Sequence, residues 1–183
     1  FFKKVLTKLK KYDIIYMNLK KEGFKMKKVK MICFDMDGTI ADLYGVNGWL
    51  EGLRAYDPTP YIKAEPMWDM TELAEVLMKL QIVGIEIRII TWLSVGSTTE
   101  YDNEVRKAKR EWLENMGFPY DHFHGVKYGT TKASCVSRYL EENETAILID
   151  DNAKVRNGWS LGDTIDPTNE NVIETLKALF DSL

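Results

Sequence analysis

Short apolar runs alternate with segments of helical periodicity along this chain, and this alternation constrains the fold more than any other feature of the sequence. Apolar runs of strand length occupy 29–34, 86–90 and 145–149, and further short strands are expected at 122–126 and 162–165. Apolar residues recur at helical spacing in 71–80, 103–116, 131–140 and 171–180. Strands that alternate with helices build a parallel sheet covered on both faces, so we expect an α/β three-layer sandwich.

The polar residues with the greatest chemical potential fall where the expected strands end. Asp35 and Asp37 follow the first strand, Thr91 follows the strand at 86–90, and Asp150 and Asp151 follow the strand at 145–149. In open parallel sheets the ligand site lies beyond the carboxyl ends of the strands. We therefore expect these side chains to meet in one site.

The segment Asp35-Met36-Asp37-Gly38-Thr39 carries the strongest chemical signal. Two carboxylates two residues apart at a strand end can converge on one ligand. Gly38 lets the backbone turn sharply and approach a phosphate group closely, and the Thr39 hydroxyl can donate a hydrogen bond. Gly38 and Thr39 are therefore expected to contact a phosphorylated substrate.

This segment resembles the DxDGT motif of the haloacid dehalogenase (HAD) superfamily. Further motifs of the superfamily appear in the required order: Thr91 stands at its Thr/Ser position, Lys132 at its Lys position, and Asp150-Asp151 at its acidic pair. The resemblance spans 29–166. It implies a HAD-like Rossmannoid fold with a central parallel sheet, helices on both faces and a small cap inserted after the first strand.

The same resemblance implies a Mg²⁺-dependent phosphomonoester hydrolase. Asp35 is expected to attack phosphorus and form an aspartyl phosphate, and Asp37 to act as general acid and then general base. Asp35 and Asp151 side chains and the Asp37 backbone carbonyl are the implied Mg²⁺ ligands, with Asp150 in or beside that set. Which of Asp150 and Asp151 binds the ion directly is left open.

Two further catalytic residues are implied by their positions among the superfamily motifs. The Thr91 hydroxyl and the Lys132 ammonium group are expected to stabilise the extra charge on the phosphoryl group during transfer. An Asp in the second acidic position favours the phosphatase branch of the superfamily over the dehalogenase branch, which needs no acid for a leaving group there.

Within the superfamily, the second half of the chain is similar to the 5'(3')-deoxyribonucleotidases. Residues 109–112 resemble a Lys-x-Glu-Trp pattern whose Lys helps to bind phosphate, and 149–152 resemble an Ile-Asp-Asp-Arg pattern. Trp92 stands where that family has Ser, and 94–98 lengthen the loop that follows. The resemblance implies a 5'-nucleotidase acting on (deoxy)nucleoside monophosphates, with Lys109 and Trp92 expected to contact the substrate.

The segment 42–70 is too short for a full second domain, and we interpret it as a small cap or flap over the site. It is rich in rings, which are carried by Tyr44, Trp49, Tyr56, Tyr61 and Trp68. These side chains could stack a nucleobase, or they could pack the cap onto the body of the protein. The sequence alone leaves both roles open.

Charge is distributed unevenly along the chain. Residues 1–30 hold eleven lysines and two acidic residues, whereas the remaining residues hold 14 basic and 26 acidic side chains, within an overall net charge of −3. An acidic body disfavours binding of a nucleic acid, which requires a basic face. No apolar stretch reaches the ~20 residues of a membrane span, and two cysteines make no disulfide framework, so we expect a cytoplasmic protein.

Residues 1–25 differ from the rest of the chain in composition. They consist almost wholly of Phe, Lys, Tyr, Ile, Asn and Leu, and Lys21-Glu22-Gly23 could be encoded by a bacterial ribosome-binding sequence just before Met26. We therefore expect 26–183 to be a single HAD-like domain and 1–25 to be a basic extension or a translated leader. The alternative is a basic amphipathic helix that lies on anionic lipid or RNA.

Two other functions remain open from the sequence. One is a HAD phosphatase that acts on another small phosphoester, or on a polynucleotide end or a protein phosphate. The other is a HAD-like domain that binds without catalysis, which loss of either Asp of the DxDGT motif would have favoured. The preferred partner is a small phosphomonoester, and the sequence leaves a homo-oligomer open.

Overall fold

Five parallel strands form the central sheet of the structure, a computed structural model that describes residues 28–183. The expected extension at 1–25 lies outside the described residues. The order across the sheet is β5-β4-β1-β6-β7, with β1 in the middle. The strands are β1 (Lys28–Phe34), β4 (Glu86–Trp92), β5 (His122–Val126), β6 (Glu144–Ile149) and β7 (Thr164–Ile165). The predicted parallel sheet is confirmed.

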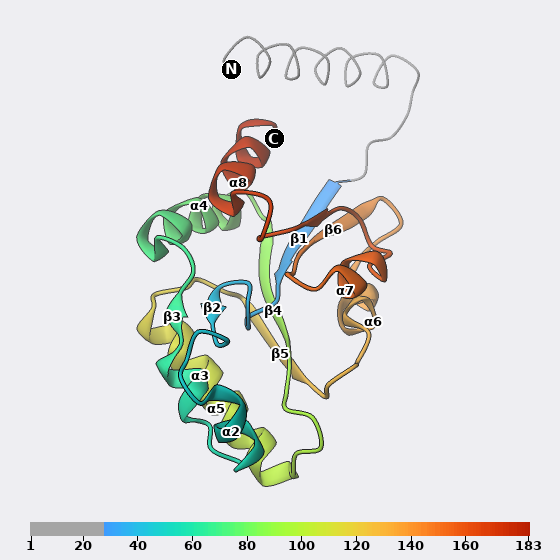
Figure 1. Cartoon of the computed structure of the whole chain (residues 1–183). Coiled ribbons are helices and arrows are strands. Elements are labelled where there is room, and N and C mark those ends of the chain that lie inside the picture. The colour runs from blue at the N-terminus through green and yellow to red at the C-terminus, as the bar shows by residue number, and fades with distance from the viewer. Residues whose placement is uncertain (1–27) are drawn as a thin grey trace, which may run out of the picture.

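Alternation along β1 explains why helices cover both faces of the sheet. Ile32 and Phe34 point into one apolar core, which includes residues of α4 (Met70–Ile82) and α8 (Val172–Asp181). Met31 and Cys33 point into a second core on the opposite face, which includes residues of α6 (Lys132–Val136). Successive side chains of a strand face opposite ways, so one central strand supplies both layers. Figure 1 shows α4 and α8 on one side of the sheet and α6 on the other.

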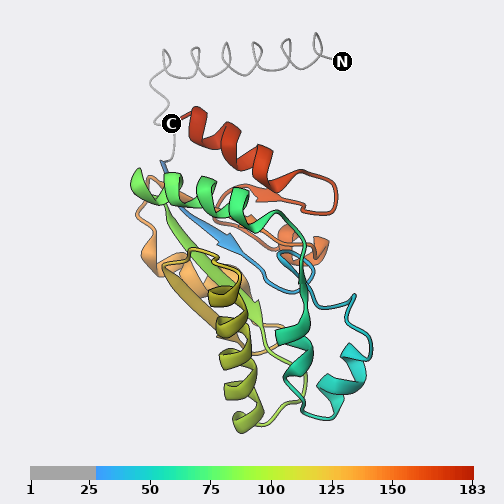
Figure 2. The ribbon, with the colours of Figure 1, turned by 90° about the vertical axis from the view of Figure 1, so that its left-hand side faces the viewer.

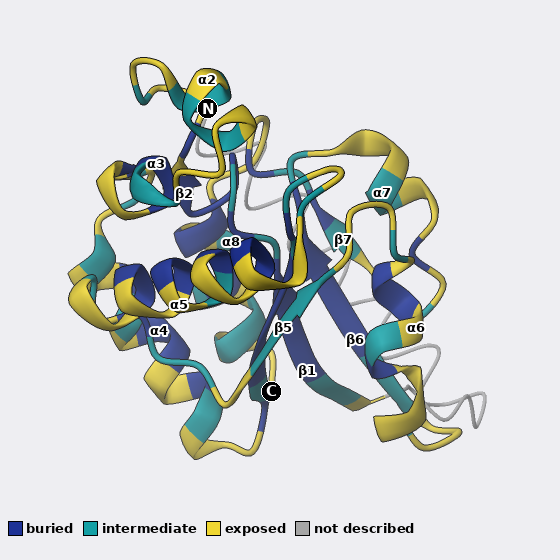
Figure 3. Cartoon of the chain, turned by 90° about the horizontal axis from the view of Figure 1, so that it is seen from below, coloured by how far each residue is buried: buried dark blue, intermediate teal, exposed yellow. Residues whose placement is uncertain are grey.

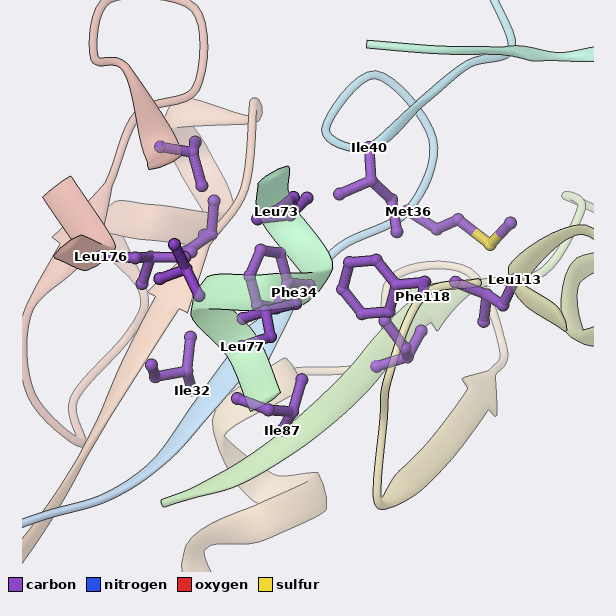
Figure 4. Close-up of a cluster of buried hydrophobic side chains, with 14 of the residues drawn as sticks. Ile32, Phe34, Met36, Ile40, Leu73, Leu77, Ile87, Leu113, Phe118 and Leu176 are labelled. Atoms are coloured by element: carbon purple, nitrogen blue, oxygen red, sulfur yellow. The ribbon is translucent and has the colours of Figure 1, made fainter. Parts of the chain in front are cut away.

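The larger core is built around Phe34. Its ring meets Phe118 edge to face, with ring centroids 5.3 Å apart. Leu73 and Leu77, four residues apart on α4, lie over the same region, as Figure 4 shows. This packing holds β1 in place, and Asp35 is the first residue after that strand.

The segment that follows β1 forms a small subdomain beyond the carboxyl ends of the strands (Figures 1 and 2). A two-stranded antiparallel sheet closes it at its base, and two short helices lie between the strands. Its elements are β2 (Ala41–Asp42), α2 (Trp49–Arg54), α3 (Thr59–Lys63) and β3 (Glu65–Pro66). α3 packs on α5 (Thr99–Asn115), where Tyr61 joins a third apolar cluster with Val105. Apolar periodicity in the sequence did not predict these short elements.

Several boundaries differ from the predicted ones for local reasons. α5 begins at Thr99 instead of 103, because the Thr98 hydroxyl accepts a hydrogen bond from the backbone N–H of Tyr101 and caps the helix. β4 continues through Trp92, so Thr91 lies inside the strand. The helix expected at 131–140 is shorter and runs into a 3₁₀ helix, η1 (Ser137–Tyr139).

Outside the segment 42–70, the sequence also failed to predict one short helix. α7 (Ala153–Asn157) follows the acidic pair directly, and the Asn152 side chain caps it by accepting hydrogen bonds from the N–H groups of Lys154 and Val155. At five residues it is too short for a periodic apolar pattern to reveal it.

Burial follows the layers of the fold. Figure 3 shows β1 and β6 buried along most of their length, while the surrounding helices expose one face and bury the other. Among residues 28–183, no helix combines the length and the apolar character that crossing a membrane requires.

Candidate active site

Three carboxylates converge where β1 and β6 end. One oxygen from each of Asp35, Asp150 and Asp151 lies within 4.8 Å of the others. β1 and β6 are neighbours in the sheet, with Phe34 opposite Ile149, so the residues that follow emerge side by side. The expected meeting of the strand ends therefore occurs.

A tight turn follows Asp35 and brings the chain back across the site. Gly38 has a φ of +75°, and its N–H donates to the backbone carbonyl of Ala41 at 2.8 Å. A Cβ at this position would lie 2.7 Å from the Tyr44 ring and 2.8 Å from a carboxylate oxygen of Asp151. Glycine is required here by both the backbone conformation and the lack of space.

Lys132 neutralises part of the carboxylate cluster. Its ammonium group donates to Asp35 Oδ1 at 2.8 Å and to Asp150 Oδ2 at 2.7 Å, and its side chain is buried. Burial by itself lowers the pKa of Lys132, but the two carboxylates outweigh it and hold the pKa above its usual value. Lys132 is therefore a fixed positive charge beside Asp35.

The two acidic residues after β6 differ in their surroundings. Asp150 is fully buried, and its two oxygens accept hydrogen bonds from the Asn152 N–H at 2.9 Å and from Lys132. Asp151 is less buried, and its backbone N–H donates to the Thr39 hydroxyl at 3.1 Å. The Asp151 carboxylate is thus the freer of the two to bind a cation.

Repulsion within the cluster makes a cation favourable. Burial, followed by the negative charges of Asp35 and Asp150, raises the pKa of Asp151 from 3.8 to about 6. A bound divalent cation would relieve that repulsion, and a set of carboxylate oxygens is the donor chemistry that Mg²⁺ prefers. The residues present fit the implied ion.

Asp37 and Lys109 form a second charged unit beside the cluster. The buried Lys109 ammonium group donates to Asp37 Oδ2 at 2.5 Å, to the Thr91 hydroxyl at 2.7 Å and to the Trp92 carbonyl at 3.1 Å. Burial raises the pKa of Asp37 above its usual value, although Lys109 acts in the opposite direction. The proton-carrying form of Asp37 is therefore more accessible than that of an ordinary Asp.

An arginine that the sequence did not single out fixes the backbone of the acidic pair. The Arg156 guanidinium donates to the backbone carbonyl of Asp150 at 2.6 Å and to the Asp166 carboxylate at 2.5 Å. It thereby joins α7, the end of β6 and the segment after β7. No motif or periodicity marks Arg156, because the contact depends on how three separate segments come together.

A cavity of about 540 Å³ opens beside Asp35 and Asp37. Its walls carry several rings, those of Tyr44, Trp49, Tyr61, Trp92 and Tyr128. Trp92 is held in place, since its indole N–H donates to the Thr130 carbonyl at 2.9 Å and its ring lies 4.8 Å from that of Tyr128. Of the five rings expected in the cap, Tyr44, Trp49 and Tyr61 thus line this cavity, whereas Tyr56 and Trp68 do not. Tyr128, which the sequence did not indicate, lines it as well.

The structure brings the predicted site residues together, with different degrees of access. Asp35, Asp37 and Trp92 line the cavity. Thr39 and Lys109 are fully buried, so in this conformation they hold neighbouring groups in place. The remaining predicted residues surround the carboxylates or shape the turn beside them: Gly38, Thr91, Lys132, Asp150 and Asp151.

Comparison with known proteins gives matches in structure only. No protein-family model matches the chain, and no curated protein does. A chain from the structure of the Pnkp1/Rnl/Hen1 RNA repair complex aligns with a TM-score of 0.51 and 17% identity, covering 77% of this chain and 42% of that one. This chain therefore spans less than half the length of that relative.

A second solved structure, a protein from Mesorhizobium loti described as a HAD-like phosphatase, aligns with a TM-score of 0.49 and 11% identity. That alignment covers 85% of this chain and 88% of the other. At such identities the similarity concerns the fold. With its central parallel sheet flanked by helices, the chain has an α/β fold, as the sequence predicted.

Proposed function

We propose that this protein is a Mg²⁺-dependent phosphomonoester hydrolase that acts through an aspartyl phosphate on Asp35. The observation that carries the proposal is the position of the Asp35 carboxylate. It lines the cavity, lies 2.8 Å from a buried ammonium group and belongs to a cluster of three carboxylates. That arrangement matches what attack on a phosphoryl group requires: a nucleophile, fixed positive charge and a place for a cation.

The Asp35 and Asp151 side chains, with the Asp37 backbone carbonyl, would hold Mg²⁺. The free carboxylate of Asp151 favours it over Asp150, whose oxygens are both engaged. When bound, the ion supplies positive charge that offsets the repulsion between an anionic phosphoryl group and a carboxylate nucleophile.

Asp35 carries out the phosphoryl transfer, and Asp37 carries out the proton transfers. A carboxylate oxygen of Asp35 forms a bond to phosphorus while the bond from phosphorus to the leaving oxygen breaks. Asp37, with its raised pKa, gives its proton to that oxygen, and the alcohol departs. Asp37 then takes a proton from a water molecule as the water oxygen attacks phosphorus, which releases Asp35 and inorganic phosphate.

Lys132, Thr91 and Lys109 keep these groups in place. Lys132 offsets charge on Asp35 and the phosphoryl group, and the Thr91 hydroxyl can donate to a phosphoryl oxygen while it accepts from Lys109. Lys109 orients the Asp37 carboxylate through its own hydrogen bond. We assign Lys109 to this positioning role, alongside the phosphate contact that the family resemblance implies.

We propose a nucleoside monophosphate as the substrate and the segment 42–70 as the cap over it. The rings on the cavity walls support this, because they can stack on a nucleobase. A phosphorylated polynucleotide end is the alternative, and similarity in fold to a chain of an RNA repair complex brings it into view. The acidic body disfavours it, since few phosphates of a polynucleotide would meet a lysine or arginine.

The test is phosphate release from a panel of deoxyribo- and ribonucleoside monophosphates and from p-nitrophenyl phosphate, with and without Mg²⁺. We expect release that needs Mg²⁺ and falls to the rate of the blank in Asp35→Asn. Asp163→Asn is the matched control, because this exposed carboxylate lies outside the cluster. Release from p-nitrophenyl phosphate alone would reject the nucleotide substrate, and Mg²⁺-independent release, or equal activity of Asp35→Asn, would contradict the mechanism.

A further inference from the structure

The cavity beside Asp35 is lined mostly by apolar and aromatic side chains. Rings and aliphatic side chains form most of its wall, including Leu43, Leu50 and Leu53 beside the rings named above. Such walls favour a planar, weakly polar group in the space that a leaving group would occupy.

Three of the residues that line this cavity carry a charged side chain. Asp35 and Asp37 stand where phosphoryl transfer is proposed, and Arg54 is the third. Arg54 is the last residue of α2 and lies one turn after Leu50, so both side chains occupy the same face of that helix. That face is a wall of the cavity, and it places a guanidinium group on the wall that the cap contributes.

Within residues 28–183, other lysine and arginine side chains form ion pairs with carboxylates, but the Arg54 guanidinium group forms none. Its side chain is exposed, so a ligand in the cavity can reach it. A guanidinium group binds carboxylate and phosphate oxygens in a planar, two-bonded geometry. Because the body of the protein is acidic, a second anionic group on a ligand would otherwise be repelled from this surface.

We infer that the substrate is a phosphomonoester whose leaving group contains a planar ring and carries a second anionic group, and that Arg54 binds this group. The inference rests on the proposed hydrolase function and narrows its substrate, because a nucleotide satisfies it only where the leaving nucleoside carries a further anionic group, such as a second phosphate. The phosphoryl group meets Asp35, the ring lies between the apolar walls, and the second anion meets the guanidinium group. Carboxylate and phosphate share the required chemistry.

The test compares kcat/KM for four aryl esters: phenyl phosphate, 4-carboxyphenyl phosphate, 4-(aminomethyl)phenyl phosphate and 1,4-phenylene bisphosphate. Each ester is measured with the wild-type protein, Arg54→Gln and Lys63→Gln. Lys63 is an exposed cation of the neighbouring helix α3 and does not line the cavity. Lys63→Gln therefore changes the net charge of the protein by the same amount as Arg54→Gln without altering the cavity. The ratio of variant to wild type for one ester cancels the ester's own reactivity.

We expect Arg54→Gln to lower kcat/KM for the anionic esters by about fivefold, as for an exposed ion pair. Phenyl phosphate should be unaffected, and the aminomethyl ester should improve. Whichever of 4-carboxyphenyl phosphate and 1,4-phenylene bisphosphate loses more kcat/KM identifies the anion that Arg54 prefers. Added salt should make this loss smaller. Lys63→Gln should change all four esters equally.

The inference would be overturned if Arg54→Gln lowered kcat/KM equally for phenyl phosphate and for the two esters with a second anionic group, or if it changed neither. Hydrolysis of p-nitrophenyl phosphate by the wild-type protein, without preference for any anionic ester over phenyl phosphate, would also overturn it and leave the proposed function standing. If the protein releases phosphate from nucleoside monophosphates but hydrolyses none of the four aryl esters, the inference fails and the proposed function stands. If it hydrolyses neither the nucleotides nor the esters, both fail. Circular dichroism spectra of Arg54→Gln and Lys63→Gln that equal the wild-type spectrum show that both variants are folded.

Discussion

Several residues of this site orient other residues through hydrogen bonds. Lys109 and Thr39 are buried, and their polar atoms bond to groups of the candidate site. Arg156 is a further example, since its guanidinium group joins the Asp150 carbonyl to Asp166. Partners of this kind orient metal ligands, and their loss commonly weakens metal binding without removing a ligand.

Replacing Arg156 with Gln should therefore weaken Mg²⁺ binding by roughly tenfold, because the backbone that carries Asp151 loses its anchor. Isothermal titration calorimetry with Mg²⁺ measures the change directly. Lys154→Gln removes a positive charge from the same helix without touching the Asp150 carbonyl, and it should leave the affinity unchanged. Equal affinities of the wild type and Arg156→Gln would show that the anchor is not needed.

At the scale of elements, the turns decide where the functional groups point. Gly38 and Gly84 both have positive φ, of +75° and +90° respectively. Only Gly38 is crowded, by Tyr44 and Asp151, whereas a Cβ at Gly84 would meet nothing within 4 Å. The two glycines therefore separate the cost of the backbone conformation from the cost of disturbing the site.

Both Gly38→Ala and Gly84→Ala should lose about 1–2 kcal/mol of unfolding free energy from the left-handed backbone alone. Only Gly38→Ala should also lose activity, by roughly a hundredfold in kcat/KM, because its new Cβ displaces Asp151 and Tyr44. Urea unfolding and phosphate release measure the two effects. An active Gly38→Ala variant would show that the turn can shift without disturbing the carboxylates.

At the scale of the whole molecule, the carboxylate cluster is expected to make the unfolding free energy depend on pH. The pKa of Asp151 is raised to about 6 in the folded protein from a usual value of 3.8. Between these values the folded state binds more protons than the unfolded state. The unfolding free energy of the metal-free protein should therefore fall as pH rises through this range.

Mg²⁺ should reverse this loss, because it binds the ionised carboxylates of the folded state. At about pH 8 and a free Mg²⁺ concentration of 100 times Kd, stabilisation should approach about 2.7 kcal/mol, and at about pH 5 protons should compete and reduce it. Differential scanning calorimetry should then show a Mg²⁺-induced rise in Tm of roughly 5–10 °C at the higher pH and a smaller rise at the lower pH. Asp151→Asn should flatten both dependences, and an unchanged metal response in that variant would exclude Asp151 as a ligand.

The sequence by itself determined the order of the main strands and helices and the chemistry at the strand ends. Apolar periodicity is a local property, and so is the residue that follows each strand, which is why Asp35, Thr91 and Asp150 could be assigned to one edge of the sheet. The short pieces between β1 and α4 escaped prediction, since helices of five or six residues show too little periodicity.

Only the tertiary structure decided which side chains touch. Lys109 reaches Asp37 across 72 positions of sequence, and Arg156 finds a backbone carbonyl, which no pattern of residue types can mark. Likewise Arg54 lines the same cavity as Asp35 because α2 packs against α3, which in turn packs on α5. Contacts of this kind depend on the distances between separate elements, and packing sets those distances after the elements have formed.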